Sequence, residues 1–132
     1  MVITYKVNSK VEAHQFADLI KSSGLRRPVE DLNRLKKMLD NANLIVSAWD
    51  GERLIGLARA LTDYSYCCYI SDLAVDREYQ KQGIGHELIT EIQKLVGDES
   101  MLLVIASPES MEYYPKIGFT KIDNAFLIPR KR

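Results

Sequence analysis

The most informative stretch of the sequence is Val75-Asp-Arg-Glu-Tyr-Gln-Lys-Gln-Gly-Ile-Gly-His86, which predicts the end of a strand, a short basic turn with two glycines and the start of a helix. A turn of this kind directs consecutive backbone N–H groups outward at the positive end of the helix dipole. Gly83 and Gly85 have no Cβ, so a bulky anion can approach the main chain closely. The stretch therefore predicts a phosphate-binding turn, and glycines kept only for packing are the alternative from this segment alone.

A second informative segment is Ser107-Pro-Glu-Ser-Met-Glu-Tyr-Tyr-Pro-Lys-Ile-Gly-Phe-Thr120. It follows an apolar run at residues 101–106, which predicts a buried strand. A serine followed by Pro108 is typical of a helix start. Pro115 and Gly118 oppose continuation, so the sequence predicts a short helix that begins at Ser107.

Together the two segments resemble the GNAT superfamily of acyl-CoA-dependent N-acetyltransferases. Gln80-Lys81-Gln82-Gly83-Ile84-Gly85 matches the family's Gln/Arg-x-x-Gly-x-Gly/Ala turn, and Tyr114-Pro115-Lys116-Ile117-Gly118-Phe119 matches its Tyr-x-x-x-Gly-Phe element. The clear match covers residues 71–120, whereas the first 60 residues match only in the order of their elements. The chain departs from the family at Ser107, where Asn is frequent, and at Pro115 directly after the tyrosine.

The expected fold class is α/β (α+β), a single domain over residues 1–132. The element order reads β-α-α-β-β-β-α-β-α-β, which fits a mixed sheet with helices on both faces and is also the order of the resembled family. That resemblance implies a twisted, mostly antiparallel sheet. The last predicted strand pair lies near residues 121–128.

Composition narrows the classes of function. The formal net charge is zero, so the whole molecule is not drawn to nucleic acid or to a membrane surface. No apolar stretch approaches the roughly 20 residues that span a bilayer, and the N-terminus lacks a signal-peptide pattern. Cys67 and Cys68 are adjacent within one expected strand, which predicts unbridged thiols and a cytoplasmic location. No spacing of histidines and cysteines suggests a metal site.

The resemblance implies direct transfer of an acetyl group from the co-substrate acetyl-CoA to a primary amine. Tyr114 would then be the acid that protonates the leaving sulfur, since a phenol with a pKa of about 10 is protonated at neutral pH. A half-buried structural tyrosine is the alternative. Asp72 and Tyr69 are candidates by position for the base that receives the amine proton, and Asp72 reads equally as a capping carboxylate.

Cofactor contacts are also implied by the resemblance. Backbone groups of the strand before the turn would hold the pantetheine arm, and the turn amides would take the pyrophosphate. Ser107 and Lys116 are among these predicted contacts. The alternative role for Ser107 is a helix cap, and the alternative for Lys116 is a charge exposed to solvent. The full set is Leu73, Ala74, Val75, Gln80, Lys81, Gln82, Gly83, Ile84, Gly85, His86, Ser107 and Lys116.

The acceptor pocket of the family is built by the first two helices and the neighbouring strands. Arg26 and Arg27 lie in that joint, and Tyr64 and Tyr66 in a turn that could face it. We hypothesise an acceptor that carries a carboxylate or phosphate, with a solvated basic loop as the alternative. The expected partner is a small-molecule or peptide amine, and small members of the family often form homodimers. The alternative functions are a non-catalytic acyl-CoA-binding or sensor module and a structural domain.

Overall fold

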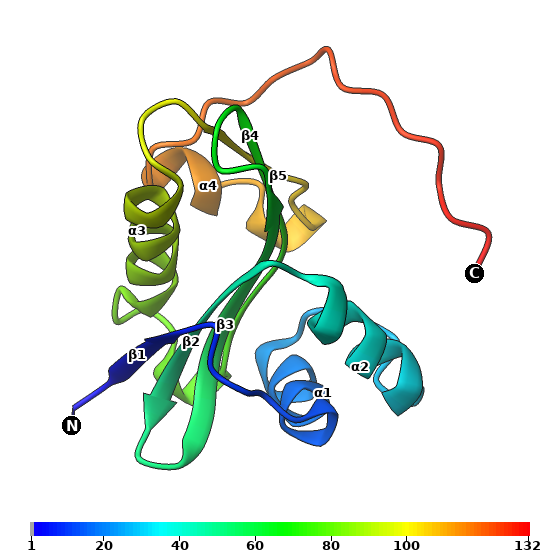
Figure 1. Cartoon of the computed structure of the whole chain (residues 1–132), viewed down its shortest axis with the longest axis vertical. Coiled ribbons are helices and arrows are strands. Elements are labelled where there is room, and N and C mark those ends of the chain that lie inside the picture. The colour runs from blue at the N-terminus through cyan, green and yellow to red at the C-terminus, as the bar shows by residue number, and fades with distance from the viewer. Residues whose placement is uncertain (1) are drawn as a thin grey trace.

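The computed structural model describes residues 2–132, and within them the sheet has five strands in the order β1-β2-β3-β4-β5 (Figure 1). β1 (Thr4–Val7), β2 (Leu44–Asp50), β3 (Arg53–Thr62) and β4 (Cys67–Val75) are antiparallel neighbours. β5 (Met101–Val104) runs parallel to β4 at the edge of the sheet. The mixed, mostly antiparallel sheet is confirmed.

Helices cover both faces of this sheet (Figure 1). α3 (Ile84–Val96) packs on one face, and α1 (Ala13–Ser23) and α2 (Leu32–Asn41) pack on the other. Residues that alternate along β2 point to opposite faces, so each strand contributes to both cores. The α3 core includes Val46, Ile55, Leu88 and Ile92, and the α1–α2 core includes Phe16, Leu35, Trp49 and Leu57.

Local capping fixes where the first two helices begin. α1 follows Glu12, whose backbone N–H donates to the Gln15 side chain at 2.9 Å while the Glu12 side chain accepts from the backbone of Gln15. α2 follows Asp31, whose carboxylate accepts from the backbone N–H of Arg34 at 3.0 Å. Each acceptor satisfies a helix N–H that has no partner inside the helix.

Two irregularities in the middle of β4 open the sheet ahead of the glycine turn, residues 80–85. Arg59 pairs with Asp72 and Ala60 with Ile70, so Ser71 bulges out of the ladder between β3 and β4. Pairing between β4 and β5 also ends here, at Ile70 and Val104. The second half of β4 therefore runs on with one edge free of strand partners among the described residues.

The segment after β5 differs from the sequence prediction in two ways. Instead of one helix from Ser107, the chain forms the 3-10 turn η2 (Pro108–Ser110) and the one-turn helix α4 (Tyr113–Lys116). The Ser107 hydroxyl bonds to the Ser110 hydroxyl at 3.0 Å and does not cap a backbone N–H. The strand predicted near residues 121–128 is wrong, because this segment leaves the sheet and Phe126 is 99% exposed. Up to α4 the element order is as predicted.

The turn between β3 and β4 is closed by Asp63. Its carboxylate accepts from the backbone N–H groups of Ser65, Tyr66 and Cys67 at 2.8–3.0 Å, and these bonds lower the Asp63 pKa from 3.8 to about 2. Because the Asp63 pKa is lower in the folded protein than in the unfolded chain, the ionised carboxylate stabilises the turn above pH 3.8. This stabilisation is lost as the pH falls through about 2. We expect a carboxyl titration followed by NMR to give Asp63 a midpoint near 2. A midpoint near 4 would show that the three bonds do not form in solution.

Candidate active site

The glycine turn presents a row of free backbone donors. It follows the 3-10 turn η1 (Arg77–Tyr79), and Lys81 and Gly83 adopt left-handed φ angles of 65° and 82°. Within the described part of the chain, none of the backbone N–H groups of residues 81–86 donates to a protein acceptor. The first bonded amide is that of Glu87, which donates to the Gly83 carbonyl at 2.9 Å. Six consecutive donors at a helix N-terminus form a geometry suited to an anion.

Side chains of the turn have two different roles. The Gln80 amide nitrogen donates to the carbonyls of Val75 at 2.8 Å and Ser23 at 3.4 Å, so this side chain joins the end of β4 to the end of α1. Lys81, Gln82 and His86 are exposed at the rim. Gln80 therefore shapes the turn, and the donors available to a ligand are the amides and the rim side chains.

The free part of β4 leads directly into this turn. Leu73 and Val75 pack toward the α3 core, and Ala74, 2% exposed, packs into the core on the α1–α2 face. Their backbones pair with β3 on one side, while no β5 pairing accompanies them on the other. An extended ligand can add to such an edge as a further strand does.

Tyr113 of α4 lies against the turn, and Tyr114 packs beside it. A Cβ placed on Gly85 would be 2.5 Å from the Tyr113 hydroxyl and 3.8 Å from Val75 Cγ2, so the absence of a side chain at Gly85 admits the Tyr113 ring. The rings of Tyr113 and Tyr114 meet edge to face at 5.3 Å, and Tyr114 meets Phe119 in the same way at 5.3 Å. Tyr113 was not predicted, and no spacing in the sequence indicates its contact with Gly85.

The Tyr114 hydroxyl keeps its proton and donates to none of the described residues. Burial raises the pKa of Tyr114 to about 12, the neighbouring Tyr113 adds to the shift, and the charge of Arg27 opposes it. No hydrogen bond with a described residue contributes to this shift. The hydroxyl can therefore give its proton to a ligand atom without breaking a bond inside the protein.

Asp72 is the centre of a buried ion triad. Its side chain is fully buried, Oδ1 accepts from Arg27 Nε at 2.5 Å, and Oδ2 accepts from Arg59 Nε. Both oxygens are thus engaged by guanidinium groups, an arrangement that favours a positioning role over proton abstraction. Arg59 was not predicted as a site residue, although a lone arginine in the apolar run of residues 54–61 is a signal in the sequence.

The Arg27 guanidinium is held by hydrogen bonds within the protein. Besides Asp72, its guanidinium donates to the Arg26 carbonyl at 2.6 Å and the Ser71 carbonyl at 2.7 Å. It ties the joint between α1 and α2 to the bulge of β4. Arg26 is exposed and forms no ion pair with a described residue.

The remaining predicted residues lie at the margins of the candidate site. Tyr64 donates its hydroxyl to the Asn43 carbonyl at 3.3 Å, at the far end of β4 from the glycine turn, and Tyr66 is 78% exposed beside it. The structure does not bring these two tyrosines to the arginine joint. Lys116 is exposed in the last turn of α4, and the Ser107 hydroxyl is held by Ser110.

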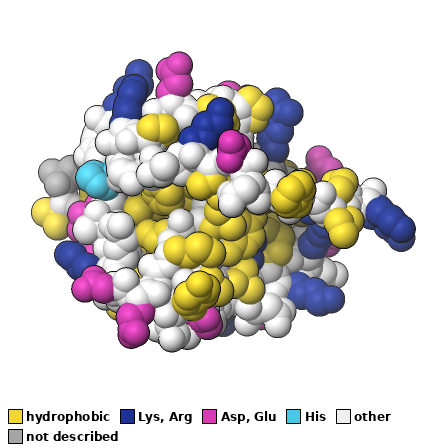
Figure 2. All heavy atoms as spheres, turned by 90° about the horizontal axis from the view of Figure 1, so that it is seen from above, with side chains coloured by type: hydrophobic (Ala, Val, Ile, Leu, Met, Phe, Trp, Pro, Cys, Tyr) yellow, Lys and Arg dark blue, Asp and Glu magenta, His cyan; other side chains and the backbone are white. Residues whose placement is uncertain are grey.

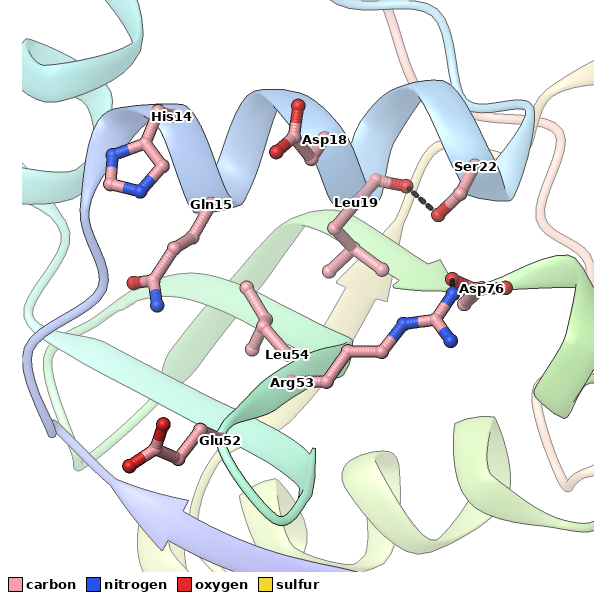
Figure 3. A pocket seen from close by; sticks show the side chains of 9 residues that line it. All are labelled: His14, Gln15, Asp18, Leu19, Ser22, Glu52, Arg53, Leu54 and Asp76. Atoms are coloured by element: carbon pink, nitrogen blue, oxygen red, sulfur yellow. Dashed lines mark hydrogen bonds and ion pairs between the residues drawn. The ribbon is translucent and has the colours of Figure 1, made fainter.

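A groove of about 400 Å³ lies apart from the predicted residues, between α1 and the β2–β3 hairpin (Figure 3). Arg53 lies in it and pairs with Asp76 at 2.9 Å, and His14, Asp18 and Glu52 also line it. None of the residues predicted for the cofactor, the acceptor or catalysis lines this groove. Its ion pair is exposed on the Arg53 side, and the groove contains no donor row comparable to the glycine turn.

Comparison with known proteins agrees with the fold and shows the family of the chain. The acetyltransferase (GNAT) domain matches residues 7–127, and the chain belongs to this family. Acetyl transfer is thereby supported at the level of the family.

Curated relatives are named N-acetyltransferases. The chain is 32% identical over 119 residues to the uncharacterized N-acetyltransferase ycf52 of Gracilaria tenuistipitata var. liui, covering 85% of this chain and 64% of that protein. It is 33% identical over 113 residues to a ycf52-like protein of Prochlorococcus marinus, covering 80% of this chain and 61% of that one. The chain thus spans somewhat less than two thirds of the length of these two relatives.

Solved structures share the fold. A probable acetyltransferase of Staphylococcus aureus superposes with a TM-score of 0.83 at 24% identity, over 98% of this chain and all of that one. The aminoglycoside N-acetyltransferase AAC(6')-Iy, solved in complex with CoA, superposes with a TM-score of 0.74 at 16% identity, over 99% and 96% of the two chains.

No helix among residues 2–132 is both long enough and apolar enough to cross a bilayer. No three of their histidine, cysteine, aspartate or glutamate side chains gather as a metal-binding group would require.

Proposed function

We propose that the protein transfers an acetyl group directly from acetyl-CoA to a primary amine. One observation supports the proposal: the six free amides of residues 81–86 follow the free edge of β4, and Tyr114 packs against Tyr113, which contacts the turn at Gly85. The diphosphate of acetyl-CoA needs donors such as these amides, and its extended, amide-containing arm needs a free strand edge. The leaving thiolate needs a proton donor such as the tyrosine.

Acetyl-CoA would supply an acetyl group activated as a thioester. The amides of residues 81–86 would hold its pyrophosphate, with Lys81 and His86 at the rim, and residues 73–75 would hold its pantetheine arm. Tyr114 would donate its proton to the departing sulfur as the amine nitrogen bonds to the acetyl carbon, and the amine's own proton would pass to water. Asp72 would act as a positioning residue, because it holds Arg27 and with it the joint between α1 and α2.

The acceptor is proposed to be a small-molecule or peptide amine. Of the two arginines in the joint, Arg26 keeps its guanidinium free of ion pairs with described residues, and we assign to it an acidic group of the acceptor. Cys67 and Cys68 are both unbridged, which supports the proposed cytoplasmic location.

The test begins with acetyl-CoA binding, followed by thiol release with a panel of amines. We expect a rise in Tm that grows with acetyl-CoA concentration, as mass action requires, and turnover of amines that carry a carboxylate or phosphate. Binding without thiol release from any amine would favour the non-catalytic sensor module. Absence of a Tm shift would overturn the cofactor site.

The variant Gly83→Ala tests whether acetyl-CoA binds at the glycine turn. The new Cβ points into open space where the anion would approach, at a φ of 82° that L side chains rarely adopt. We expect affinity for acetyl-CoA to fall at least about tenfold, beside a stability loss of about 1–2 kcal/mol from the left-handed backbone.

Gly51→Ala is the matched control, since Gly51 also has a positive φ, of 61°, and open space, but lies in the β2–β3 turn. It should cost similar stability and leave acetyl-CoA affinity unchanged, as measured by calorimetry. Equal losses of affinity in both variants would contradict the assignment of the pyrophosphate to the turn.

A further inference from the structure

The 3-10 turn η1 connects the end of β4 to the glycine turn, so its position sets the position of the free amides. Its last residue, Tyr79, directly precedes Gln80. Lys81, with a φ of 65°, keeps a left-handed backbone that a residue with a Cβ adopts only where the surrounding structure holds it. The contacts that hold η1 therefore decide how accurately the amides are placed.

A short hydrogen bond joins η1 to the last residue of β2. The Tyr79 hydroxyl donates to Asp50 Oδ2 at 2.6 Å, within the range of a charge-assisted hydrogen bond. Tyr79 is 8% exposed and belongs to the α3 core, so water competes little for this bond. The bond to Asp50 and burial raise the pKa of Tyr79, so its hydroxyl stays protonated and remains the donor.

Arg53, the first residue of β3, holds η1 a second time (Figure 3). Its guanidinium pairs with Asp76 at 2.9 Å, and Asp76 accepts from the backbone N–H of Glu78 inside η1 at 2.9 Å. The same guanidinium lies over the Tyr79 ring, 5.5 Å from its centroid. Because the Arg53 side chain is 52% exposed, solvent weakens this pair, and the bond of Tyr79 to Asp50 is the firmer of the two.

The end of α1 holds η1 and the glycine turn from the other side. A Cβ placed on Gly24, the C-cap of α1, would be 2.7 Å from Arg77 Nη2, so the absence of a side chain there admits the Arg77 guanidinium. Gln80 adds its bond to the Ser23 carbonyl. These contacts lie toward the end of the molecule where the β2–β3 hairpin turns (Figure 1). Figure 2 shows the opposite end from above, where apolar side chains gather at the surface.

We propose that Tyr79 and Asp50 are positioning residues for the cofactor, because their hydrogen bond fixes η1 and, through it, the direction of the free amides of residues 81–86. The inference rests on the proposed function for the identity of the ligand, acetyl-CoA. The order of the unliganded turn does not depend on that function. A site that must be ordered on binding loses affinity for its ligand, whereas group transfer from the bound ligand keeps its rate.

The test variant is Tyr79→Phe, which removes the hydroxyl and keeps the ring in the α3 core. We expect the Kd for acetyl-CoA, measured by calorimetry, to rise at least about fivefold with the loss of this bond. The kcat at saturating acetyl-CoA and the KM for the amine should stay close to those of the wild type, whereas a general loss of structure would lower kcat as well. Asp50→Asn keeps an oxygen that accepts the hydroxyl, so it should lose less affinity than Asp50→Ala.

Tyr5→Phe is the matched control. Tyr5 lies on β1 and also packs against the α3 core, so its variant removes a hydroxyl from the same core without touching the link to the hairpin. It should leave the Kd for acetyl-CoA unchanged. Gly51 lies between the two hairpin residues that hold η1, and a Cβ there meets open space, so Gly51→Ala leaves both in place.

Backbone NMR of the unliganded chain gives a readout that needs no activity. Order parameters of residues 80–85 should be about 0.85, as in a rigid backbone, in the wild type and in Tyr5→Phe, and lower in Tyr79→Phe. Unchanged order parameters in Tyr79→Phe would overturn the inference, as would an unchanged affinity for acetyl-CoA. A wild type that does not bind acetyl-CoA would instead overturn the proposed cofactor site, and the order parameters would still decide whether Tyr79 positions the turn.

Discussion

Asp72→Ala should lower the free energy of unfolding by about 3–5 kcal/mol, more than any other single substitution considered for this protein. The carboxylate is fully buried between Arg27 and Arg59, and the Arg59 side chain is itself only 9% exposed. Removing the carboxylate leaves a desolvated guanidinium without its counter-charge, and that cost exceeds the net value of the intact pair. Chemical denaturation of the purified chain measures the effect.

Asp40→Ala is the control for this prediction. Asp40 also accepts an ion pair, from Lys36 at 2.6 Å, but both side chains are exposed on the surface of α2. Pairs of this kind contribute little, so the variant should unfold close to the wild type. A loss of less than 1 kcal/mol in Asp72→Ala would contradict the buried triad, as would equal losses in the two variants.

A second measurement separates a positioning role of Asp72 from a role as the base. Asp72→Asn keeps the size of the side chain and removes its charge. If Asp72 only positions Arg27, the folded fraction of Asp72→Asn should keep the pH dependence of the wild-type rate while its kcat falls. Loss of the basic group from the pH–rate profile would assign proton abstraction to Asp72.

The sequence predicts most of the fold because its decisive signals are local. Gly83 must stand at a left-handed position before α3, and the alternation of side chains along β2 and β3 fixes which residues face each layer. The strand predicted near residues 121–128 fails for a different reason. Its apolar composition is that of a strand, but a strand forms only where it pairs with another, and residues 121–128 pair with no strand among the described residues.

The site is less predictable, because its contacts join residues far apart in the chain. Gln80 matches the family turn in sequence, yet its side chain bonds to Val75 and to Ser23, 57 residues away. Asp72 reads as a base or a cap until Arg27 and Arg59 are found on both of its oxygens. Chemical type and local spacing indicate which residues can act, whereas tertiary contacts decide which atoms remain free to do so.

Tyr114→Phe should lower kcat by about 10²- to 10⁴-fold while acetyl-CoA binding is retained. The hydroxyl makes no hydrogen bond to a described residue, so its removal should change neither the fold nor the stability appreciably. The comparison is Tyr113→Phe, which removes the hydroxyl of the neighbouring ring at Gly85 and should keep a kcat close to that of the wild type. Equal losses in the two variants, or an unchanged kcat in Tyr114→Phe, would contradict the role of Tyr114 as the acid.

The raised pKa of Tyr114, about 12, also determines the expected pH dependence. An acid acts in its protonated form, and Tyr114 keeps its proton at every pH below about 12, so this group should cause no loss of rate between pH 7 and 10. A phenol of this pKa is a weak donor to a thiolate in water, where a thiol has a pKa of about 8.5. The same burial would also raise the pKa of a thiol leaving beside Tyr114, so burial does not widen the gap between the two groups by the full shift of the phenol. An alkaline decline in kcat below pH 10 that disappears in Tyr114→Phe would show that the tyrosine titrates there, and would contradict a buried, protonated acid.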